Sequence, residues 1–274
     1  MNWVEFVFKL RDEDSFKDIL IARLSLLGFD SFDETDKKLK GYIDEKKVTD
    51  FFLEELKIIS KTSFTFSSLE NKNWNELWES NFHPIMIGEN CFVRAPFHEK
   101  KEVKYDVLIS PKMAFGTGHH ETTRMMILEL FNLQDVPKKV LDVGCGTGIL
   151  SILSEKIWST KVMAIDTDNW AIENSLENLK INKCVNTKLT HGGIETQEES
   201  GEYDLILANI NTNVLVQDLK SYFNLLQLNG ILILSGFLFE DFLKINKQAT
   251  KLGLILINQN EEKKWQCVVF RKNG

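Results

Sequence analysis

Three glycines alternate along the chain directly after an apolar, β-branched run. Gly144, Gly146 and Gly148 follow residues 140–143, and an apolar segment with helical spacing begins at Ile149. This order predicts a strand, a tight turn and a helix, and glycine lets the turn take unusual dihedral angles and approach a ligand closely. A dinucleotide-binding turn needs its third glycine three residues after the second, which is the position of Ile149. The turn is therefore predicted to hold a nucleotide-like ligand without a pyrophosphate.

Acidic side chains stand at the ends of the first two strands of this region. Asp166 ends the strand near 161–165, about twenty residues after the turn, where nucleoside-binding folds place an acid that accepts from both ribose hydroxyls. Asp168 is predicted to cap the following helix. Asp142 precedes the turn, and two roles are equally open for it: holding backbone amides of the turn, or touching the ligand. Trp170 could cover a base or simply pack.

A folded loop at 111–124 precedes the first strand of the sheet. Its sequence, Pro-Lys-Met-Ala-Phe-Gly-Thr-Gly-His-His-Glu-Thr-Thr-Arg, surrounds a threonine with glycines and ends in residues typical of a helix start. The adjacent histidines point in different directions and lack an H-x-x-x-H partner, so no metal site is predicted. This loop is expected to belong to the site rather than to a linker.

These motifs resemble those of known methyltransferases. The pattern Asp-x-Gly-x-Gly-x-Gly resembles the first motif of class I enzymes that bind S-adenosylmethionine, and Ala-Phe-Gly-Thr-Gly-x-His-x-Thr-Thr is similar to a signature of the PrmA family. That family methylates lysine ε-amines and the α-amine of the eleventh protein of the large ribosomal subunit. The resemblance covers most of the chain and departs from the pattern at Glu121, where many relatives have proline. It implies these cofactor-binding residues: Phe115, Thr117, Thr123, Gly144, Gly146, Gly148, Asp166 and Asn209.

Asn209 is the residue to which the resemblance assigns catalysis. It follows the apolar strand near 205–208, and amine methyltransferases use this loop to present carbonyl oxygens to the nitrogen that is methylated. Asn209 could instead cap the following helix, although Asn211 or Thr212 could serve that purpose. A free lysine has a pKa of about 10.4, so its neutral form costs about 4–5 kcal/mol at pH 7. Because desolvation beside a cationic sulfonium lowers that pKa, no side chain is required as a base.

Composition and charge narrow the function further. The net charge of −7 disfavours non-specific electrostatic binding to a phosphate backbone and suits a basic protein partner. No nucleic acid is therefore expected to be required. Four separated cysteines indicate neither disulfides nor a structural zinc. With no secretion signal and no apolar run of about 18 residues, the chain is interpreted as a cytoplasmic protein without membrane contact. A monomer is expected.

The elements that must position these residues fall into two domains. Strands near 139–143, 161–165, 187–190, 205–208 and 231–234 alternate with helices, and 254–258 and 266–270 flank a charged turn. This predicts an α/β fold with a doubly wound, mostly parallel seven-stranded sheet closed by an antiparallel hairpin. Before it, strands at 4–8, 29–33, 39–44 and 63–67 and helices at 15–27 and 48–58 predict a small α+β ferredoxin-like domain. A short helix at 74–81 and strands at 91–95 and 106–109 lie between. The expected division is 1–70 for substrate docking, 71–110 as linker and lead-in, and 111–274 for catalysis.

Three other hypotheses compete with a protein methyltransferase. A nicotinamide-dependent oxidoreductase shares the fold class but needs the missing third glycine. A methyltransferase of RNA or of a small molecule is disfavoured by the acidic charge and by the docking-like first domain. A module that only binds S-adenosylmethionine would not need the loop at Asn209.

Overall fold

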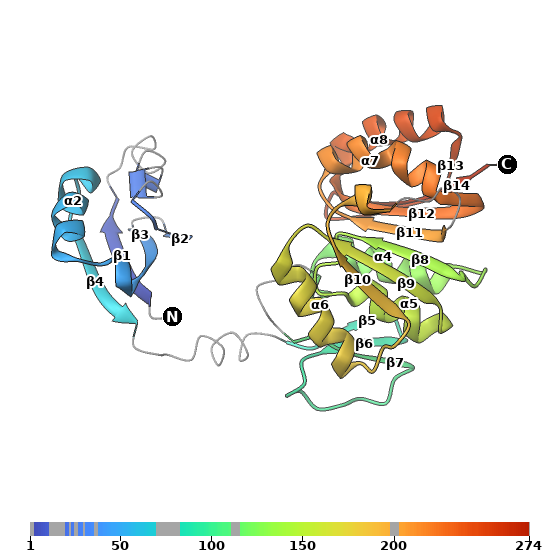
Figure 1. Ribbon diagram of the computed structural model, residues 1–274, viewed down its shortest axis with the longest axis horizontal. Coiled ribbons are helices and arrows are strands. Elements are labelled where there is room, and N and C mark those ends of the chain that lie inside the picture. The colour runs from blue at the N-terminus through green and yellow to red at the C-terminus, as the bar shows by residue number, and fades with distance from the viewer. Residues whose placement is uncertain are drawn as a thin grey trace. The chain divides into compact units, whose positions relative to one another are not determined.

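The computed structural model describes residues 3–10, 20–21, 23–24, 27–29, 31–35, 38–69, 83–110, 116–197 and 203–273. Contacts divide the chain into two compact units, Met1–Asn81 and Phe82–Gly274 (Figure 1). Most of the expected helix at 15–27 and all of the expected helix at 74–81 lie outside the described residues. The assignment of docking, linker and catalytic roles to 1–70, 71–110 and 111–274 stays a prediction.

The smaller unit is an antiparallel sheet with a helix packed on it. Its strands lie in the order β2-β3-β1-β4, and Phe6, Phe8 and Leu56 are fully buried between sheet and helix. The helix begins two residues later than predicted because the side chain of Thr49 accepts from the backbone N–H of Phe52 and so caps it. The described elements follow the predicted chain order, and the ferredoxin-like fold stays a prediction. Their bounds are β1 Trp3–Lys9, β2 Ser31–Thr35, β3 Lys38–Asp44, η1 Glu45–Lys47, α2 Asp50–Ser60 and β4 Phe64–Leu69.

The larger unit confirms the predicted doubly wound sheet. Its seven strands have the order β10-β9-β8-β11-β12-β14-β13, in which the first five are parallel and β14 runs antiparallel to both of its neighbours. The central parallel strands β8 and β11 are largely buried on both faces, as such strands usually are, whereas the edge strand β10 is partly exposed. Their bounds are β8 Lys139–Val143, β9 Lys161–Asp166, β10 Thr187–His191, β11 Tyr203–Asn209 and β12 Leu226–Leu238, with β13 Leu254–Glu262 and β14 Trp265–Lys272 forming the terminal hairpin.

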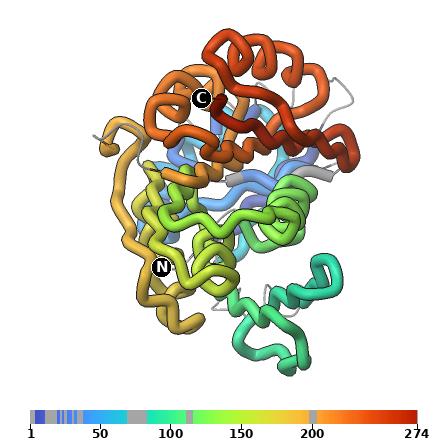
Figure 2. The backbone as a smooth tube through the Cα atoms, turned by 90° about the vertical axis from the view of Figure 1, so that its right-hand side faces the viewer, coloured from blue at the N-terminus to red at the C-terminus, as the bar shows by residue number. Residues whose placement is uncertain are grey.

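Helices cover both faces of this sheet. Along β11, Leu205 and Leu207 join one apolar cluster while Ile206 and Ala208 join the other, because successive side chains of a strand point to opposite faces. The first cluster includes residues of α4, α5 and α6, and the second includes residues of α7 and α8 (Figures 1 and 2). The helix bounds are α4 Glu121–Asn132, α5 Ile149–Trp158, α6 Asn169–Ile181, α7 Thr212–Leu225 and α8 Phe239–Leu252, with η2 at Ile194–Thr196.

Two local features shape the edge at which the parallel strands end. A short sheet, β5 Ile85–Ile87, β6 Cys91–Arg94 and β7 Tyr105–Leu108, contributes Val93 and Val107 to the core shared with α4 and α5. The terminal hairpin turns at Lys263 and Lys264, both at positive φ (49° and 72°), which is the geometry of a two-residue hairpin turn. The hairpin is longer than predicted, so its turn lies near the start of α4.

Candidate active site

A cavity of about 530 Å³ opens where the parallel strands end. Its lining comes from the ends of β8, β9, β11 and β12, the segment after β10, the starts of α4 and α6, helix α7 and the first residue of β14. Ligands of open α/β sheets bind at this edge, and the volume lies in the range of about 300–1,000 Å³ typical of small-molecule sites. Four predicted residues, Gly144, Gly146, Asp166 and Asn209, line it.

The glycine turn has the backbone that its sequence demands. Gly144, Gly146 and Gly148 have φ values of 69°, 56° and 77°, a left-handed region costly for other residues. Gly144 and Gly146 border the cavity, whereas Gly148 is the N-cap of α5 and lies against α6, where a Cβ would come within 3.0 Å of Ser175 Oγ. The first two glycines thus place backbone at the cavity, and the third allows close packing of helices.

Asp166 ties the turn to the end of the second strand of the motif. Its Oδ2 accepts from the backbone N–H of Gly146 at 2.9 Å, and its Oδ1 accepts from that of Asp168 at 3.0 Å. Each carboxylate oxygen can accept a further bond, so the group is fixed in place and still able to bind hydroxyls facing the cavity. Asp168 caps α6 as predicted, accepting from the N–H of Trp170 at 2.9 Å. The side chain of Trp170 is 74% exposed and does not line the cavity.

Asp142 takes a role that neither sequence alternative described. Its carboxylate is almost fully buried, does not line the cavity, and accepts from the Ser151 hydroxyl in the first turns of α5 at 2.6 Å. Burial, with a smaller contribution from the charge of Asp166, raises the pKa of Asp142 to about 6. Asp142 therefore fastens α5 to β8 and titrates near neutral pH.

Replacing Asp142 by asparagine is expected to change how stability depends on pH. The folded pKa lies above the unfolded value of about 3.8, so the native state loses up to roughly 3 kcal/mol of stability as pH rises from 4 through 6. Asp142→Asn removes this titration, and its free energy of unfolding relative to wild type should improve across that window. Denaturant unfolding at several pH values measures the difference, with Asp168→Asn as an exposed control. A constant difference between pH 4 and 7 would contradict a raised pKa.

Asn209 reaches the cavity from the last position of β11. Its Nδ2 donates to Thr123 Oγ1 at 3.2 Å, while its Oδ1 is buried and has no hydrogen-bond partner among the described residues. Asn211 caps α7 by accepting from the N–H of Val214 at 3.2 Å, so the capping alternative for Asn209 does not apply. A buried carbonyl oxygen without a donor is costly, which points to a donor arriving with a ligand.

The loop before α4 is held against the glycine turn. Thr147 Oγ1 donates to the carbonyl of Gly116, and Asn178 of α6 joins the carbonyl of Thr147 to the backbone N–H of Ser110. Thr117 does not line the cavity, and its Oγ1 lies 3.1 Å from His119 Nδ1. Thr123 does not line the cavity either, but it accepts a hydrogen bond from Asn209, which does. Phe115 lies outside the described residues.

Two glycines pack closely against Ile210, the residue after Asn209. A Cβ on Gly144 would lie 2.3 Å from Ile210 Cγ2, and one on Gly236 would lie 2.3 Å from the carbonyl oxygen of Ile210. Gly236 has φ of 92° and sits where the pairing of β12 with β14 shifts register between Ser235 and Phe237. At this irregularity the backbone of Gly236 packs directly against the backbone of Ile210. This contact fixes the segment that carries Asn209.

Gly236→Ala is expected to displace this segment. It should lower turnover by more than its effect on stability alone would explain. The matched control is Gly253→Ala at the end of α8, where φ is 97° but a Cβ would meet nothing closer than 3.6 Å. Both changes should cost about 1–2 kcal/mol through backbone strain, and Gly236→Ala should cost more than that because its Cβ also meets the backbone of Ile210. Only Gly236→Ala should lower kcat, by about tenfold or more, because a small misplacement of reacting groups is costly. Equal kcat values for the two variants would contradict the positioning role.

The chain is similar in sequence to known proteins over nearly its whole length. Residues 17–273 match the family described as "Ribosomal protein L11 methyltransferase (PrmA)". The chain is 37% identical to the ribosomal protein L11 methyltransferase of Bacteroides fragilis, over 98% of this chain and 99% of that one. It is 38% identical to that of Porphyromonas gingivalis, over 98% of each.

The chain belongs to the PrmA family.

A crystal structure of ribosomal protein L11 methylase from Lactobacillus delbrueckii subsp. bulgaricus is similar in fold, with a TM-score of 0.65 and 22% identity over 70% of this chain and all of that one. The family resemblance expected from the two sequence motifs is confirmed, and the protein is a methyltransferase whose cofactor is S-adenosylmethionine.

Sequence reasoning missed several side chains that this PrmA chain brings to the cavity, among them an aromatic pair. His120 and Trp265 both line it, with ring centroids 4.8 Å apart in an edge-to-face arrangement. His120 caps α4, its Nδ1 accepting from the N–H of Thr122 at 3.3 Å, so it serves first as a cap. Trp265 begins β14 and pairs with Leu238, far from every motif in sequence. Only the register of the terminal hairpin brings it there, and no local pattern signals this.

Ion pairs join the start of α4 to the tip of the terminal hairpin. Glu121 accepts from Lys263 Nζ at 2.7 Å and lies 3.3 Å from Arg124 Nη2, which also donates to Glu262. The bond from Lys263, more than any other contact, lowers the pKa of Glu121 to about 2. Glu121 is the first residue of α4, a position at which proline is equally well tolerated. Glu121, at which this chain departs from the PrmA pattern, therefore leaves the start of α4 intact and adds an ion pair with the terminal hairpin.

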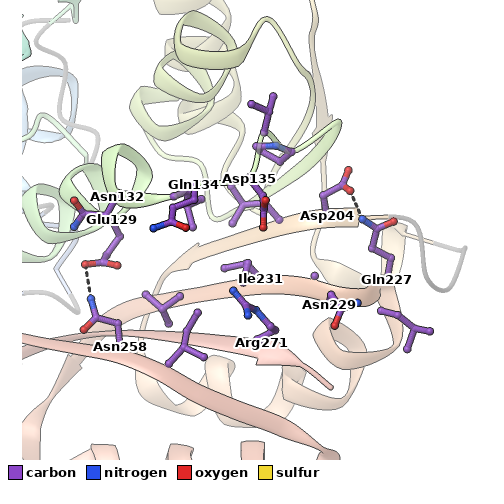
Figure 3. A pocket seen from close by; sticks show the side chains of 18 residues that line it. Glu129, Asn132, Gln134, Asp135, Asp204, Gln227, Asn229, Ile231, Asn258 and Arg271 are labelled. Carbon is purple, nitrogen blue, oxygen red and sulfur yellow. Dashed lines mark hydrogen bonds between the residues drawn. The ribbon is translucent and has the colours of Figure 1, made fainter. Parts of the chain in front are cut away.

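A second cavity, of about 580 Å³, lies near the opposite ends of the strands (Figure 3). Two pairs of its polar residues are engaged with one another: Glu129 accepts from Asn258, and Gln227 donates to Asp204, as the dashed lines show. Although it is larger, it contains none of the predicted PrmA site residues. The chemistry is assigned to the cavity at Gly144, because only there do the glycine turn and an unpartnered carbonyl oxygen meet.

Within the described part of the chain, no cluster of three or more potential metal-ligating side chains occurs. The helices described there are too short or too polar to cross a bilayer.

Proposed function

We propose that this chain methylates amino groups, lysine ε-amines and the N-terminal α-amine, of the eleventh protein of the large ribosomal subunit. Family membership supports a protein substrate, since the relatives carry that protein in their names. The observation that carries the amine specificity is the buried Oδ1 of Asn209, which has no partner among the described residues and belongs to a side chain that lines the cavity beside the glycine turn. An amine N–H is a donor that this oxygen can accept.

The residues of the cavity fit S-adenosylmethionine. Asp166 is fixed by two backbone amides with oxygens left to accept the ribose hydroxyls, and Gly144 and Gly146 leave the backbone open to the amino-acid part. Ile165, Ala171 and Ile194 provide an apolar wall for a flat base. When bound, the cofactor supplies a methyl group already activated on a sulfonium. Gly148, Thr117 and Thr123 are proposed to support the residues that line the cavity. A contact between Phe115 and the cofactor stays a prediction.

The protein contributes alignment and an uncharged nucleophile. Asn209 Oδ1 accepts one N–H of the acceptor amine and so directs the nitrogen lone pair, while Thr123 fixes the amide by accepting from Nδ2. Alignment of this kind can contribute several kcal/mol. Val143, Ile210 and Trp265 form an apolar part of the cavity wall, and desolvation against it disfavours the ammonium form, which lowers the amine pKa. His120 Nδ1 is already an acceptor for Thr122, and no base is assigned.

The smaller unit is proposed to hold the substrate protein. It exposes the apolar side chains of Phe51 (79%), Ile58 (73%) and Phe66 (50%), which a protein partner can cover. The net charge of −7 suits a basic ribosomal protein and disfavours a requirement for RNA. We propose that the enzyme acts as a monomer in the cytoplasm, where ribosomal proteins are made and assembled.

Methyl transfer to the isolated ribosomal protein tests the proposal. The enzyme is incubated with a methyl-labelled cofactor and unmethylated ribosomal proteins, and the labelled protein and peptides are identified by mass spectrometry. Label on lysine and α-amino nitrogens of the eleventh large-subunit protein is the expected result. Label on ribosomal RNA, on another protein, or on oxygen or sulfur would refute the assignment.

A further inference from the structure

The two ends of the cavity define how a nucleoside must lie in it. Asn209 ends β11, Gly144 follows β8, Asp166 ends β9, and Gly193 follows β10, in the order in which these strands are neighbours. The ribose of the cofactor carries the sulfur at one end and the base at the other. With the methyl donor at Asn209 and the ribose at Asp166, the base is directed beyond Asp166, over the segment after β10.

That segment offers a base little besides backbone and an apolar surface. Gly192 and Gly193 have no side chains, and Ile194 is buried in the cluster that includes Leu219 of α7. Glu195 is turned to the backbone: its Oε1 accepts from the N–H of Gly193 at 2.9 Å. A side-chain acceptor for the base must therefore come from another element.

Helix α7 supplies a carboxylate at this corner. Asp218 is half-buried and lines the cavity together with Gly193 and Ile194. Burial and the charge of Glu195 raise its pKa above the ordinary value, while Tyr222, one helical turn away, is the partner that lowers it. An under-solvated carboxylate gains from a new N–H donor.

We propose that Asp218 recognises the adenine base of the cofactor by accepting a hydrogen bond from its exocyclic amine. A carboxylate can only accept, so it favours adenine, which presents an amino group at that position, over hypoxanthine, which presents a carbonyl oxygen. Asp218 is thus a specificity-determining residue for the cofactor, contributed by α7 rather than by the segment after β10. The inference depends on the cofactor and not on which protein is methylated.

Binding of two product analogues tests this without turnover. The dissociation constants of S-adenosylhomocysteine and S-inosylhomocysteine are measured by calorimetry for the wild type, Asp218→Ala and Asp218→Asn. Wild type should prefer the adenosyl compound by at least about tenfold, as a charge-assisted bond requires. Asp218→Ala should bind the adenosyl compound about tenfold more weakly and the inosyl compound within about twofold of wild type, so the preference disappears.

Asp218→Asn keeps the shape of the side chain and can donate to a carbonyl oxygen. It should therefore bind the inosyl compound more tightly than wild type does, a gain that a purely structural role would not produce. Glu173→Gln, on an exposed carboxylate of α6 that does not line the cavity, is the matched control and should keep the wild-type preference. An equal loss of affinity for both compounds, or an unchanged preference in both Asp218 variants, would overturn the proposal. Because no acceptor is present, failure here is distinct from failure of the proposed protein substrate.

Discussion

Asn209→Ala is expected to lower kcat by about a hundredfold or more while changing the dissociation constant of S-adenosylmethionine by less than about threefold. The reason is the state of Asn209 Oδ1: it is buried, it has no partner among the described residues, and its residue lines the cavity in which we propose that the acceptor amine binds. Removing it leaves cofactor contacts at Asp166 and Gly144 in place but releases the amine from its orientation. Single-turnover methyl transfer and calorimetry on the same protein separate the two effects.

Asn213→Ala is a suitable control for this experiment. Asn213 is exposed in the first turn of α7, four residues from Asn209, and does not line the cavity. Its replacement should leave both kcat and cofactor affinity near wild type. If Asn209→Ala weakens cofactor binding as much as it slows turnover, Asn209 is a cofactor ligand and not a catalytic residue. Thr123→Val, which removes the acceptor for Asn209 Nδ2, should lower kcat in the same direction but by less.

Asp166→Ala is expected to weaken cofactor binding by at least about tenfold, because a carboxylate that accepts from two hydroxyls contributes about 1.5–3 kcal/mol. The loss should be larger than this minimum, since the same carboxylate also holds the N–H groups of Gly146 and Asp168 and so fixes the turn. Calorimetric titration with S-adenosylhomocysteine measures the affinity. The kcat at saturating cofactor should fall much less than the affinity does.

Asp168→Ala provides the comparison that isolates the role of Asp166. Asp168 caps α6 by accepting from Trp170, and losing a cap costs about 1 kcal/mol of stability. Its replacement should therefore lower the unfolding midpoint and leave cofactor affinity within about threefold of wild type. If the two variants lose affinity equally, the effect of Asp166→Ala reflects a loosened backbone, and the assignment of Asp166 to the ribose is wrong.

Much of the catalytic unit is decided by local sequence. Strand β8 matches its expected bounds, and the parallel strands and the hairpin were all expected, because β-branched apolar runs alternate with helical spacing. The left-handed φ values at Gly144, Gly146 and Gly148 follow from a spacing that only glycine satisfies without strain. The family was evident from two motifs for the same reason: each motif is a contiguous backbone shape, and such shapes are encoded by neighbouring residues.

The tertiary structure alone decided what surrounds these motifs. Trp265 and Asp218 enter the cavity through strand register and helix packing, Gly236 acts by closeness to Ile210, and Asp142 turned to Ser151 rather than to the turn or a ligand. Each of these contacts joins residues that the sequence pattern treats as independent. The physical reason is that a short pattern fixes dihedral angles and which face is buried, whereas contacts between elements depend on how sheet, hairpin and helices pack as a whole.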